Sequence, residues 1–159
     1  MQRYLVLALL IIAPPCFGDE LTLASLNQAE ALWRRHALSD YRFTLEQNRI
    51  AFAFPGEQTP VQVTVHNGRV TRCTFLAPVG KLPVGSLVAS KDGRRELATT
   101  IPMLFTRMRS LLSEFTDERI SFSAEFDAAL GYPRSFSLVN ASMTDVDYGF
   151  EVRDFEILQ

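Results

Sequence analysis

The chain has 159 residues, of which 47% are hydrophobic and 21% charged, and its 16 basic and 18 acidic side chains give a net charge of −2. This length suits one globular domain with a sizeable core. A slightly acidic chain lacks the positive surface that binding to nucleic acid requires, so we predict no nucleic-acid partner.

The first residues, 1–18, have the pattern of a secretory signal peptide. Arg3 supplies a positive start, residues 5–13 form an apolar run too short to span a bilayer, and Pro14-Pro15 ends that run before small residues. We therefore expect an exported protein, periplasmic or secreted, with no transmembrane span in its mature chain.

The position of cleavage decides what becomes of Cys16. Cleavage after Gly18 removes it and leaves residues 19–159 as a single domain with a net charge of about −3. Cys73 is then the one cysteine and cannot form an intrachain disulfide; we interpret it as a small apolar side chain. The alternative is a lipoprotein signal cut just before Cys16, although Ala13-Pro14-Pro15 is a poor approach to a lipidated cysteine.

Two helices are predicted from apolar side chains at helical spacing. The first covers residues 21–38, with Ser25 and Gln28 as a capping box. The second begins after Thr100 as the N-cap and carries the clearest apolar stripe in the chain, which we interpret as facing the core. The stripe consists of Ile101, Leu104, Phe105, Met108, Leu111, Leu112 and Phe115.

Residues 61–76 carry the strongest local pattern, two alternating apolar runs that meet at Asn-Gly in positions 67–68. This predicts a β-hairpin with a type I′ turn. Its valines supply the apolar face that the helices need, so we expect the hairpin at the centre of the sheet. Simple alternation puts Cys73 and Phe75 on the solvent side, which a bulge or a covering segment must explain.

Period-two alternation predicts four further strands. The alternation changes phase near residues 47–49, where either a bulge or the meeting of two short strands would explain it, and we favour the bulge because no Gly or Pro marks a turn. A second bulge is predicted near residues 153–154. The fold class is therefore α+β: a single antiparallel sheet of about six strands packed by two helices, in the order αβββαβββ. The four strands lie in residues 40–54, residues 119–127, from residue 136 onward, and about residues 146–158.

The segment 77–99 is predicted to be a long loop with several prolines and glycines. Loops of this length are uncommon in compact domains and tend to be functional. Because Lys91, Arg94 and Arg95 gather near its end, we predict that this loop contacts a partner or ligand. It does not have the spacing of a phosphate-binding loop.

The order of several short motifs identifies a family resemblance. Trp33 precedes Tyr41, the hairpin contains V-x-V-x-x-G-x-V, the second helix starts T-I-x-x-L-F, residues 126–133 read F-D-x-x-L-G-Y-P, and residues 145–155 read D-x-D-x-x-F-x-V-x-x-F. Together they resemble the domain-of-unknown-function 6174 family of exported bacterial proteins and lipoproteins. The resemblance implies an exported bacterial domain with no established activity and assigns no catalytic residues. This chain lacks the first-strand cysteines of many members, so no family disulfide is implied.

No motif for catalysis, a structural metal or a cofactor occurs in the sequence. The two histidines, His36 and His66, stand in no triad or zinc spacing, and we interpret both as solvent-facing. We therefore name no catalytic residue, no metal ligand and no cofactor.

Two weaker candidate sites remain. The first is an acidic set that could converge at strand ends, Asp127, Asp145 and Asp147, with Asp154 nearby. It has too few oxygen ligands in too open a loop to predict calcium binding. The second is the turn Gly131-Tyr132-Pro133, which we predict as a contact surface.

Two hypotheses of function follow. The favoured one is a non-catalytic, exported binding or accessory module whose partner is an unknown protein or envelope component. It would bind through the open face of the sheet, the long loop or the turn at residues 131–133. The alternative is a small hydrolase or metal-dependent enzyme that uses the carboxylates.

Overall fold

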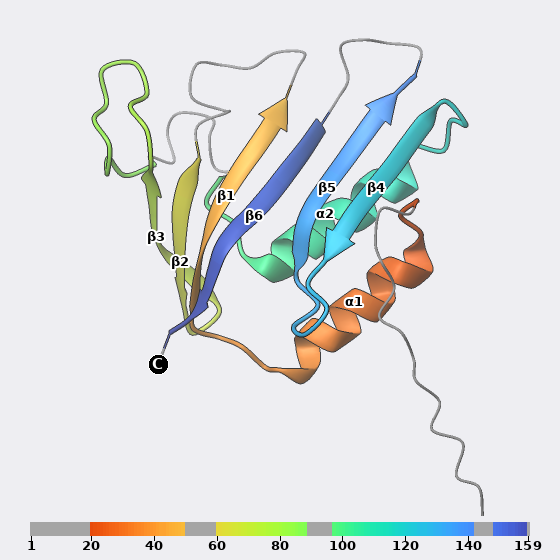
Figure 1. Cartoon of the computed structure of the whole chain (residues 1–159), viewed down its shortest axis with the longest axis horizontal. Helices are drawn as coiled ribbons and strands as arrows, with labels where there is room; N and C mark the ends of the chain where they lie inside the picture. Colours follow the sequence, from red (N-terminus) through yellow and green to blue (C-terminus); the bar gives the residue numbers. More distant parts are fainter. Residues whose placement is uncertain (1–19, 50–59, 89–96, 142–147, 159) are drawn as a thin grey trace, which may run out of the picture.

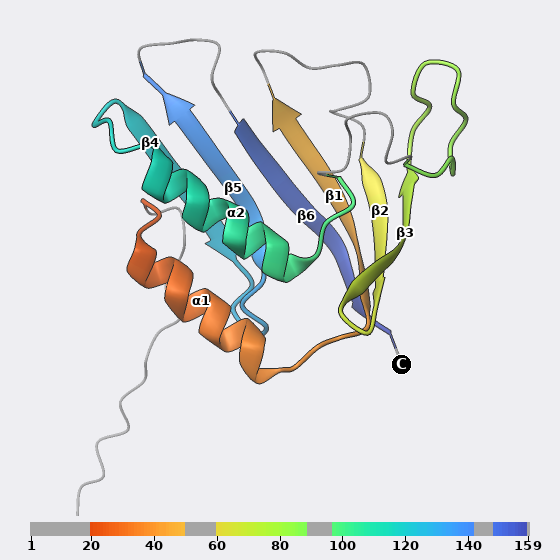
Figure 2. The same ribbon diagram turned by 180° about the vertical axis from the view of Figure 1, so that it is seen from behind.

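A computed structural model describes residues 20–49, 60–88, 97–141 and 148–158. It has one six-stranded antiparallel sheet with both helices on the same face (Figures 1 and 2), which confirms the predicted α+β class and element order. The strand order across the sheet is β3-β2-β1-β6-β5-β4. The elements are α1 (Leu23–Arg35), β1 (Tyr41–Arg49), β2 (Val61–His66), β3 (Arg69–Phe75), α2 (Ile101–Glu114), β4 (Ile120–Phe126), β5 (Pro133–Asn140) and β6 (Tyr148–Ile157).

Both helices begin at a threonine. Thr100 caps α2 as predicted, and its hydroxyl accepts from the backbone N–H of Met103. For α1 the predicted cap was wrong: Thr22 is the N-cap, and Ser25 is the third helical residue, which bonds back to it. Both are good capping residues three positions apart, so the local pattern fits either as the start of the helix.

The hairpin of β2 and β3 lies at one edge of the sheet, and the prediction that it forms the centre was wrong. The centre is the pair β1 and β6, which are the two longest strands. An edge position suits β3, because its Arg69 and Arg72 are exposed and charged residues on an edge strand oppose pairing with other chains. The predicted turn is present, with positive φ at Asn67 and Gly68.

A bulge in β3 explains the side chains that alternation placed in solvent. Val65 pairs with Val70 but Thr64 pairs with Arg72, so Thr71 is an extra residue in the ladder. The extra residue reverses the facing of the residues that follow it. Cys73 and Phe75 therefore enter the core, where they pair with Val63 and Val61 and are 5% and 1% exposed.

A second bulge joins the two central strands. Asp154 and Phe155 of β6 together oppose the single residue Phe43 of β1, and Asp154 has a φ of 50°. This confirms the bulge predicted near residues 153–154. From Thr44 to the end of β1 the register with β6 is continuous, so the bulge predicted near residues 47–49 was wrong.

The core fills the space between the helices and the sheet. Near the C-terminal end of α1, Trp33 makes edge contacts with the rings of Tyr41 and Phe155. Those two rings stack on each other with centroids 5.6 Å apart. The hydroxyl of Tyr41 accepts from the backbone N–H of Ile101, which ties β1 to the start of α2. Among the described residues, no helix covers the opposite face of the sheet (Figure 1).

Candidate functional site

The first part of the predicted long loop is folded along the edge of the sheet. Residues 76–88, here called the edge loop, leave the end of β3 and turn back beside it (Figure 1). Thr74 pairs with Leu87, and the backbone N–H of Val88 donates to the carbonyl of Cys73 at 3.0 Å. The edge loop is therefore held in a defined conformation and shields the upper half of the β3 edge.

The tip of the edge loop is closed by its own hydrogen bonds. Val79 and Leu82 exchange two backbone hydrogen bonds of 3.0 and 2.9 Å, and the side chain of Val79 is buried against the core. Ser86 donates to the carbonyl of Pro83 from both its N–H and its hydroxyl. The buried Val79 anchors the tip, and the residues on either side of the turn project outward.

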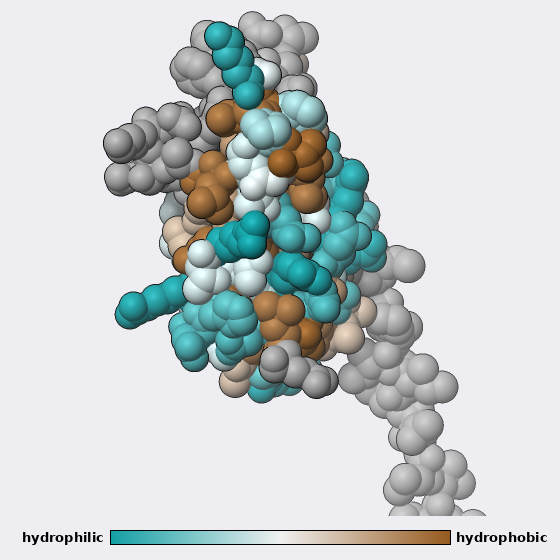
Figure 3. Space-filling model, turned by 90° about the vertical axis from the view of Figure 1, so that its left-hand side faces the viewer, coloured by the Kyte–Doolittle hydropathy of each residue, from teal (hydrophilic) through white to brown (hydrophobic). Residues whose placement is uncertain are grey.

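The edge loop exposes an unusual share of the apolar side chains. In the described part of the chain eight large hydrophobic residues are exposed, and four of them lie between residues 76 and 87. Figure 3 shows hydrophobic surface on this side of the molecule, interrupted by hydrophilic side chains. The four are Leu76 at 40% exposure, Leu82 at 40%, Val84 at 58% and Leu87 at 65%.

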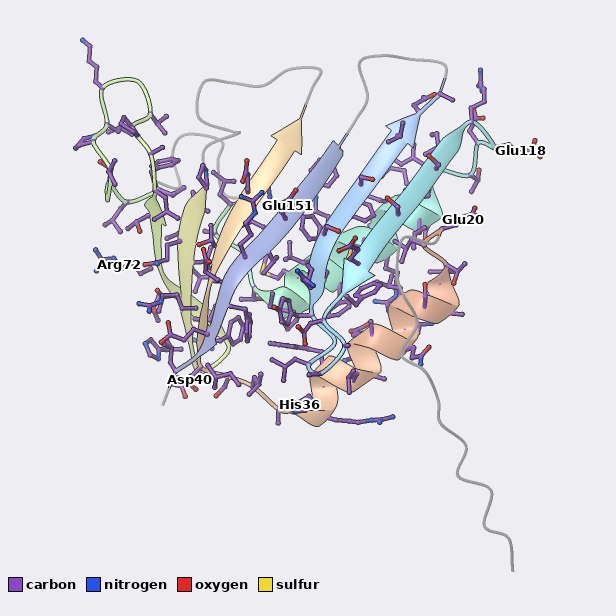
Figure 4. The ribbon with its side chains drawn as sticks, viewed as in Figure 1. Glu20, His36, Asp40, Arg72, Glu118 and Glu151 are labelled. Atoms are coloured by element: carbon purple, nitrogen blue, oxygen red, sulfur yellow. The ribbon has the colours of Figure 1, made fainter. Side chains whose placement is uncertain are left out.

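The strand register places part of this apolar surface beside an arginine. On β3, Arg72 and Thr74 point to the open face, and Leu76 continues the alternation. Leu87 lies opposite Thr74, so Leu76 and Leu87 are diagonal neighbours on that face. Arg72 is the other diagonal neighbour of Leu87, and its side chain extends away from the edge of the sheet (Figure 4).

The segment that forms the hairpin and the edge loop carries charged side chains of one sign. Residues 60–88 contain Arg69, Arg72 and Lys81 and none of the 18 acidic residues, so the rest of the chain carries 13 basic and 18 acidic side chains. All three cations are exposed. The structure thus joins an apolar surface to a positive one at the β3 edge. We call this the edge surface: Arg72, Leu76, Lys81, Leu82, Val84 and Leu87.

The sequence prediction for this loop rested on different residues. Lys91, Arg94 and Arg95 lie outside the described residues. The edge surface was missed because L-A-P-V-G-K-L-P-V-G-S-L-V was interpreted through its prolines and glycines alone. A loop with many leucines and valines between its turn residues is the pattern that points to it, because ordinary surface loops are polar.

The turn Gly131-Tyr132-Pro133 packs against helix α1. Gly131 and Pro133 are buried, and Tyr132 is half-buried with its ring stacked on Phe155 at 4.5 Å. Burial, together with the nearby carboxylate of Asp127, raises the pKa of Tyr132. The geometry gives this turn a packing role, and it contributes nothing to the edge surface.

The acidic candidates are not brought together by the described structure. The carboxylate of Asp127 accepts from the N–H groups of Ala129 and Leu130, so it holds the turn after β4. Asp154 accepts from the hydroxyl of Thr44 within the β6 bulge. Asp145 and Asp147 lie outside the described residues. Across residues 20–49, 60–88, 97–141 and 148–158, no group of three or more His, Cys, Asp or Glu side chains has the geometry of a metal site.

The two histidines and Cys73 have local partners. His66 is exposed, and its Nδ1 lies 2.9 Å from the Asp40 carboxylate. His36 is also exposed, with Nε2 at 3.0 Å from the carbonyl of Ala129. Burial raises the pKa of the Cys73 thiol to about 12, and its Sγ–H points to the carbonyl of Leu97. A thiol of that pKa is a poor nucleophile near neutral pH.

A shallow hollow of about 240 Å³ lies on the open face of the sheet. Ser123, Ser137 and Glu151 line it, and the small residue Gly149 leaves room at its floor. The hydroxyls of Ser123 and Ser137 bond to each other at 2.7 Å, and Glu151, which points from β6 in Figure 4, pairs with Arg153. These polar groups already satisfy one another, so the hollow is a weaker candidate than the edge surface.

The family comparison covers nearly the whole fold. A family model described as "Family of unknown function (DUF6174)" matches residues 25–157. The chain belongs to this family. The match runs from the first turn of α1 to the last residue of β6, so the DUF6174 domain coincides with the αβββαβββ unit and the resemblance noted in the motifs is confirmed.

One further comparison and one property of the helices bear on this DUF6174 protein. A comparison with curated proteins found no match. Among the described residues, neither helix is both long enough and apolar enough to cross a bilayer.

Proposed function

We propose that this DUF6174 protein is an exported, non-catalytic binding module that attaches to a component of the bacterial cell envelope through its edge surface. The observation that carries the proposal is the edge loop, where four exposed aliphatic side chains are held on a hydrogen-bonded backbone next to exposed cations. Grouped exposure of this kind marks interaction sites, whereas single exposed leucines need no explanation.

The fixed conformation of the edge loop supports a binding role. Exposing apolar surface costs about 25 cal/mol for each Å² left in water, so a folded loop that keeps four aliphatic side chains outside gains free energy when a partner covers them. Because the loop is already ordered, binding loses little conformational entropy. The anchor Val79 and the bridge from Thr74 to Leu87 provide that order.

Export is proposed from residues 1–18, and it has a direct test. The full chain is expressed in a bacterial host, and the mass of the protein recovered from each cell fraction is measured. A periplasmic or secreted protein that begins at Asp19 supports the cut after Gly18, and a membrane-bound form that begins at a lipidated Cys16 supports the lipoprotein alternative. Uncut protein in the cytoplasm contradicts export.

Binding through the edge surface is tested with purified residues 19–159, which contain every helix and strand of the fold. The protein is mixed with envelope particles prepared from bacterial cells and sedimented. We expect the wild type to sediment with the particles. In the triple variant Leu82→Ser, Val84→Ser and Leu87→Ser the sedimented fraction should fall by at least about 80%, because the variant removes most of the exposed apolar area of the loop.

The matched control removes three other exposed hydrophobic side chains from α1, α2 and β5 and should sediment like the wild type. An equal loss in both triple variants contradicts a specific edge surface, and so does wild-type protein that stays in the supernatant. The control substitutions are Leu23→Ser, Met103→Ser and Val139→Ser.

A further inference from the structure

We infer that the envelope component is the membrane itself: the edge loop docks on anionic lipid, with its aliphatic tip among the headgroups and its cations facing the phosphates. This inference rests on the proposed function and names its partner. Three features of the described residues carry it: the one-signed charge, the chemistry of the apolar side chains and the hydrogen bonding of the tip.

The charge pattern favours an anionic partner of large extent. Arg69, Arg72 and Lys81 stand in residues 60–88 without a single carboxylate, in a protein whose remaining residues are net acidic. A negative membrane attracts such a positive edge and repels the rest of the molecule, which orients the edge loop toward the lipid. Lys81 lies at the tip, where its ammonium can reach the phosphate plane while its stem lies along apolar chains.

The apolar side chains are of a kind that suits lipid better than protein. The exposed large hydrophobic residues of the edge loop are three leucines and one valine, and residues 76–88 contain no aromatic side chain. Protein interfaces draw their binding energy chiefly from Trp, Tyr and Arg, and Leu and Val are under-represented among their hot spots. Leucines beside basic residues are also found on the amphipathic helices that lie in membrane interfaces.

Part of the backbone around the tip is already hydrogen-bonded within the loop before it leaves water. The N–H groups of Leu82, Gly85 and Ser86 already donate to the carbonyls of Val79, Phe75 and Pro83. Pro83 has no N–H. Because unpaired backbone groups are costly in an apolar phase, these bonds lower the cost of placing the turn in the headgroup region, where water and phosphates can accept from the remaining N–H groups.

A second copy of the chain fits this edge less well. β3 carries Arg69 and Arg72 and no carboxylate, so two copies joined edge to edge would bring like charges together. The upper part of β3 is also already paired with residues 85–88 of the edge loop. Self-association remains an outcome that the experiment detects.

The test is flotation of residues 19–159 with protein-free vesicles. This form lacks the apolar run of residues 5–13, which would itself bind lipid. The vesicles are phosphatidylcholine with about 30% phosphatidylglycerol, or phosphatidylcholine alone. We expect binding to the anionic vesicles at about 0.1 M salt, at least about tenfold weaker partition to neutral vesicles, and weaker binding at about 0.5 M salt.

Two sets of variants separate the apolar and the charged contributions. The triple variant Leu82→Ser, Val84→Ser and Leu87→Ser should lower the partition coefficient at least about tenfold on anionic vesicles. The double variant Arg72→Gln and Lys81→Gln should also lower it about tenfold, but only at low salt. The controls are exposed residues elsewhere: the hydrophobic triple Leu23→Ser, Met103→Ser and Val139→Ser, and the double Arg35→Gln and Arg134→Gln.

The outcomes distinguish this inference from the proposed function. The wild type could sediment with envelope particles through the edge loop and yet not bind protein-free anionic vesicles. That result overturns the lipid inference, and the proposed function stands with a protein or glycan partner. If the triple variant binds vesicles as well as the wild type, the edge loop is not the membrane contact. If the wild type does not bind vesicles and instead forms a concentration-dependent dimer that the triple variant does not form, the surface belongs to a second copy and the inference is also overturned.

Discussion

Gly131 lies so close to helix α1 that a Cβ atom built on it would be 2.4 Å from the backbone oxygen of Ala29. The backbone nitrogen of Trp33 would be 2.9 Å away, and Gly131 itself has a φ of +81°. The turn between β4 and β5 therefore rests on the helix backbone at a point where only a hydrogen atom fits. The sequence predicted a contact surface at this turn, and in the structure the turn packs against α1.

We predict that Gly131→Ala destabilises the protein by about 2–4 kcal/mol. The substitution adds a backbone clash to the strain of a positive φ, and neither can be relieved by a side-chain rotation. Urea unfolding followed by circular dichroism measures the change.

The control for Gly131→Ala is Gly85→Ala, because Gly85 has nearly the same φ, +83°, but nothing within 4 Å of a built Cβ. It should cost only about 1 kcal/mol from backbone strain. Equal losses in the two variants would show that the approach to α1 is not tight in solution.

The ion pair between the two helices gives a pH-dependent prediction. Glu30 of α1 is buried and accepts from Arg109 of α2 at 2.6 Å and from Arg34. Burial alone would raise the pKa of Glu30, but Arg109 and Arg34 outweigh it and hold the pKa below the ordinary value of 4.5. A lowered folded-state pKa stabilises the fold above pH 4.5, and this contribution is lost as the pH falls through the folded-state pKa.

We therefore expect Glu30→Gln to lower the free energy of unfolding by about 1–2 kcal/mol at pH 7, with a difference from wild type that shrinks below pH 4.5. Urea unfolding at several pH values measures it. Glu156→Gln, in an exposed pair with Arg42, serves as the control and should have little effect at any pH. If the free energies of unfolding of the wild type and Glu30→Gln differ by the same amount from pH 7 to about pH 3, the ionised Glu30 carboxylate is not the source of the stabilisation.

The hydrogen bond between Tyr41 and the start of α2 gives a third prediction. Tyr41 is 1% exposed, and its hydroxyl accepts from the N–H of Ile101 at 3.2 Å. Tyr41→Phe leaves that helix N–H buried without its acceptor, which should cost about 1–2 kcal/mol and speed hydrogen exchange at Ile101. Tyr132→Phe keeps its ring stack on Phe155 and should cost about 0.5 kcal/mol or less. Unchanged exchange at Ile101 in the Tyr41 variant would argue against the bond.

The element order was predictable because each element carries a local pattern of its own. The stripe on α2, the alternation of β4 and the Asn67-Gly68 turn need no knowledge of the rest of the chain. The strand order was not predictable in the same way, since β1 and β6 meet across more than a hundred residues. The bulge at Thr71 was not predictable either, because an extra residue can be recognised only when the pairing partner of each β3 residue is known.

The candidate site shows a different limit. The sequence predicted partner contacts for the loop after β3 from its late cations, Lys91, Arg94 and Arg95, and gave no weight to its aliphatic residues. Whether Leu82 or Val79 is exposed depends on which of them the turn directs into the core, and their mutual pairing settles this only in three dimensions. The neighbours of Leu87 also depend on pairing in three dimensions, because its position opposite Thr74 brings it next to Leu76 and Arg72.

The last prediction concerns Cys73, which the Thr71 bulge turns into the core. Burial raises the pKa of its thiol to about 12, so only about one molecule in ten thousand carries the thiolate at pH 8. We expect native protein to react with a thiol reagent at least about a thousandfold more slowly than protein unfolded in urea. The variant Thr71→Cys with Cys73→Ser moves the thiol to an exposed position two residues away and should react at an ordinary rate. Rapid labelling of native Cys73 would mean that β3 opens readily or that the bulge lies elsewhere.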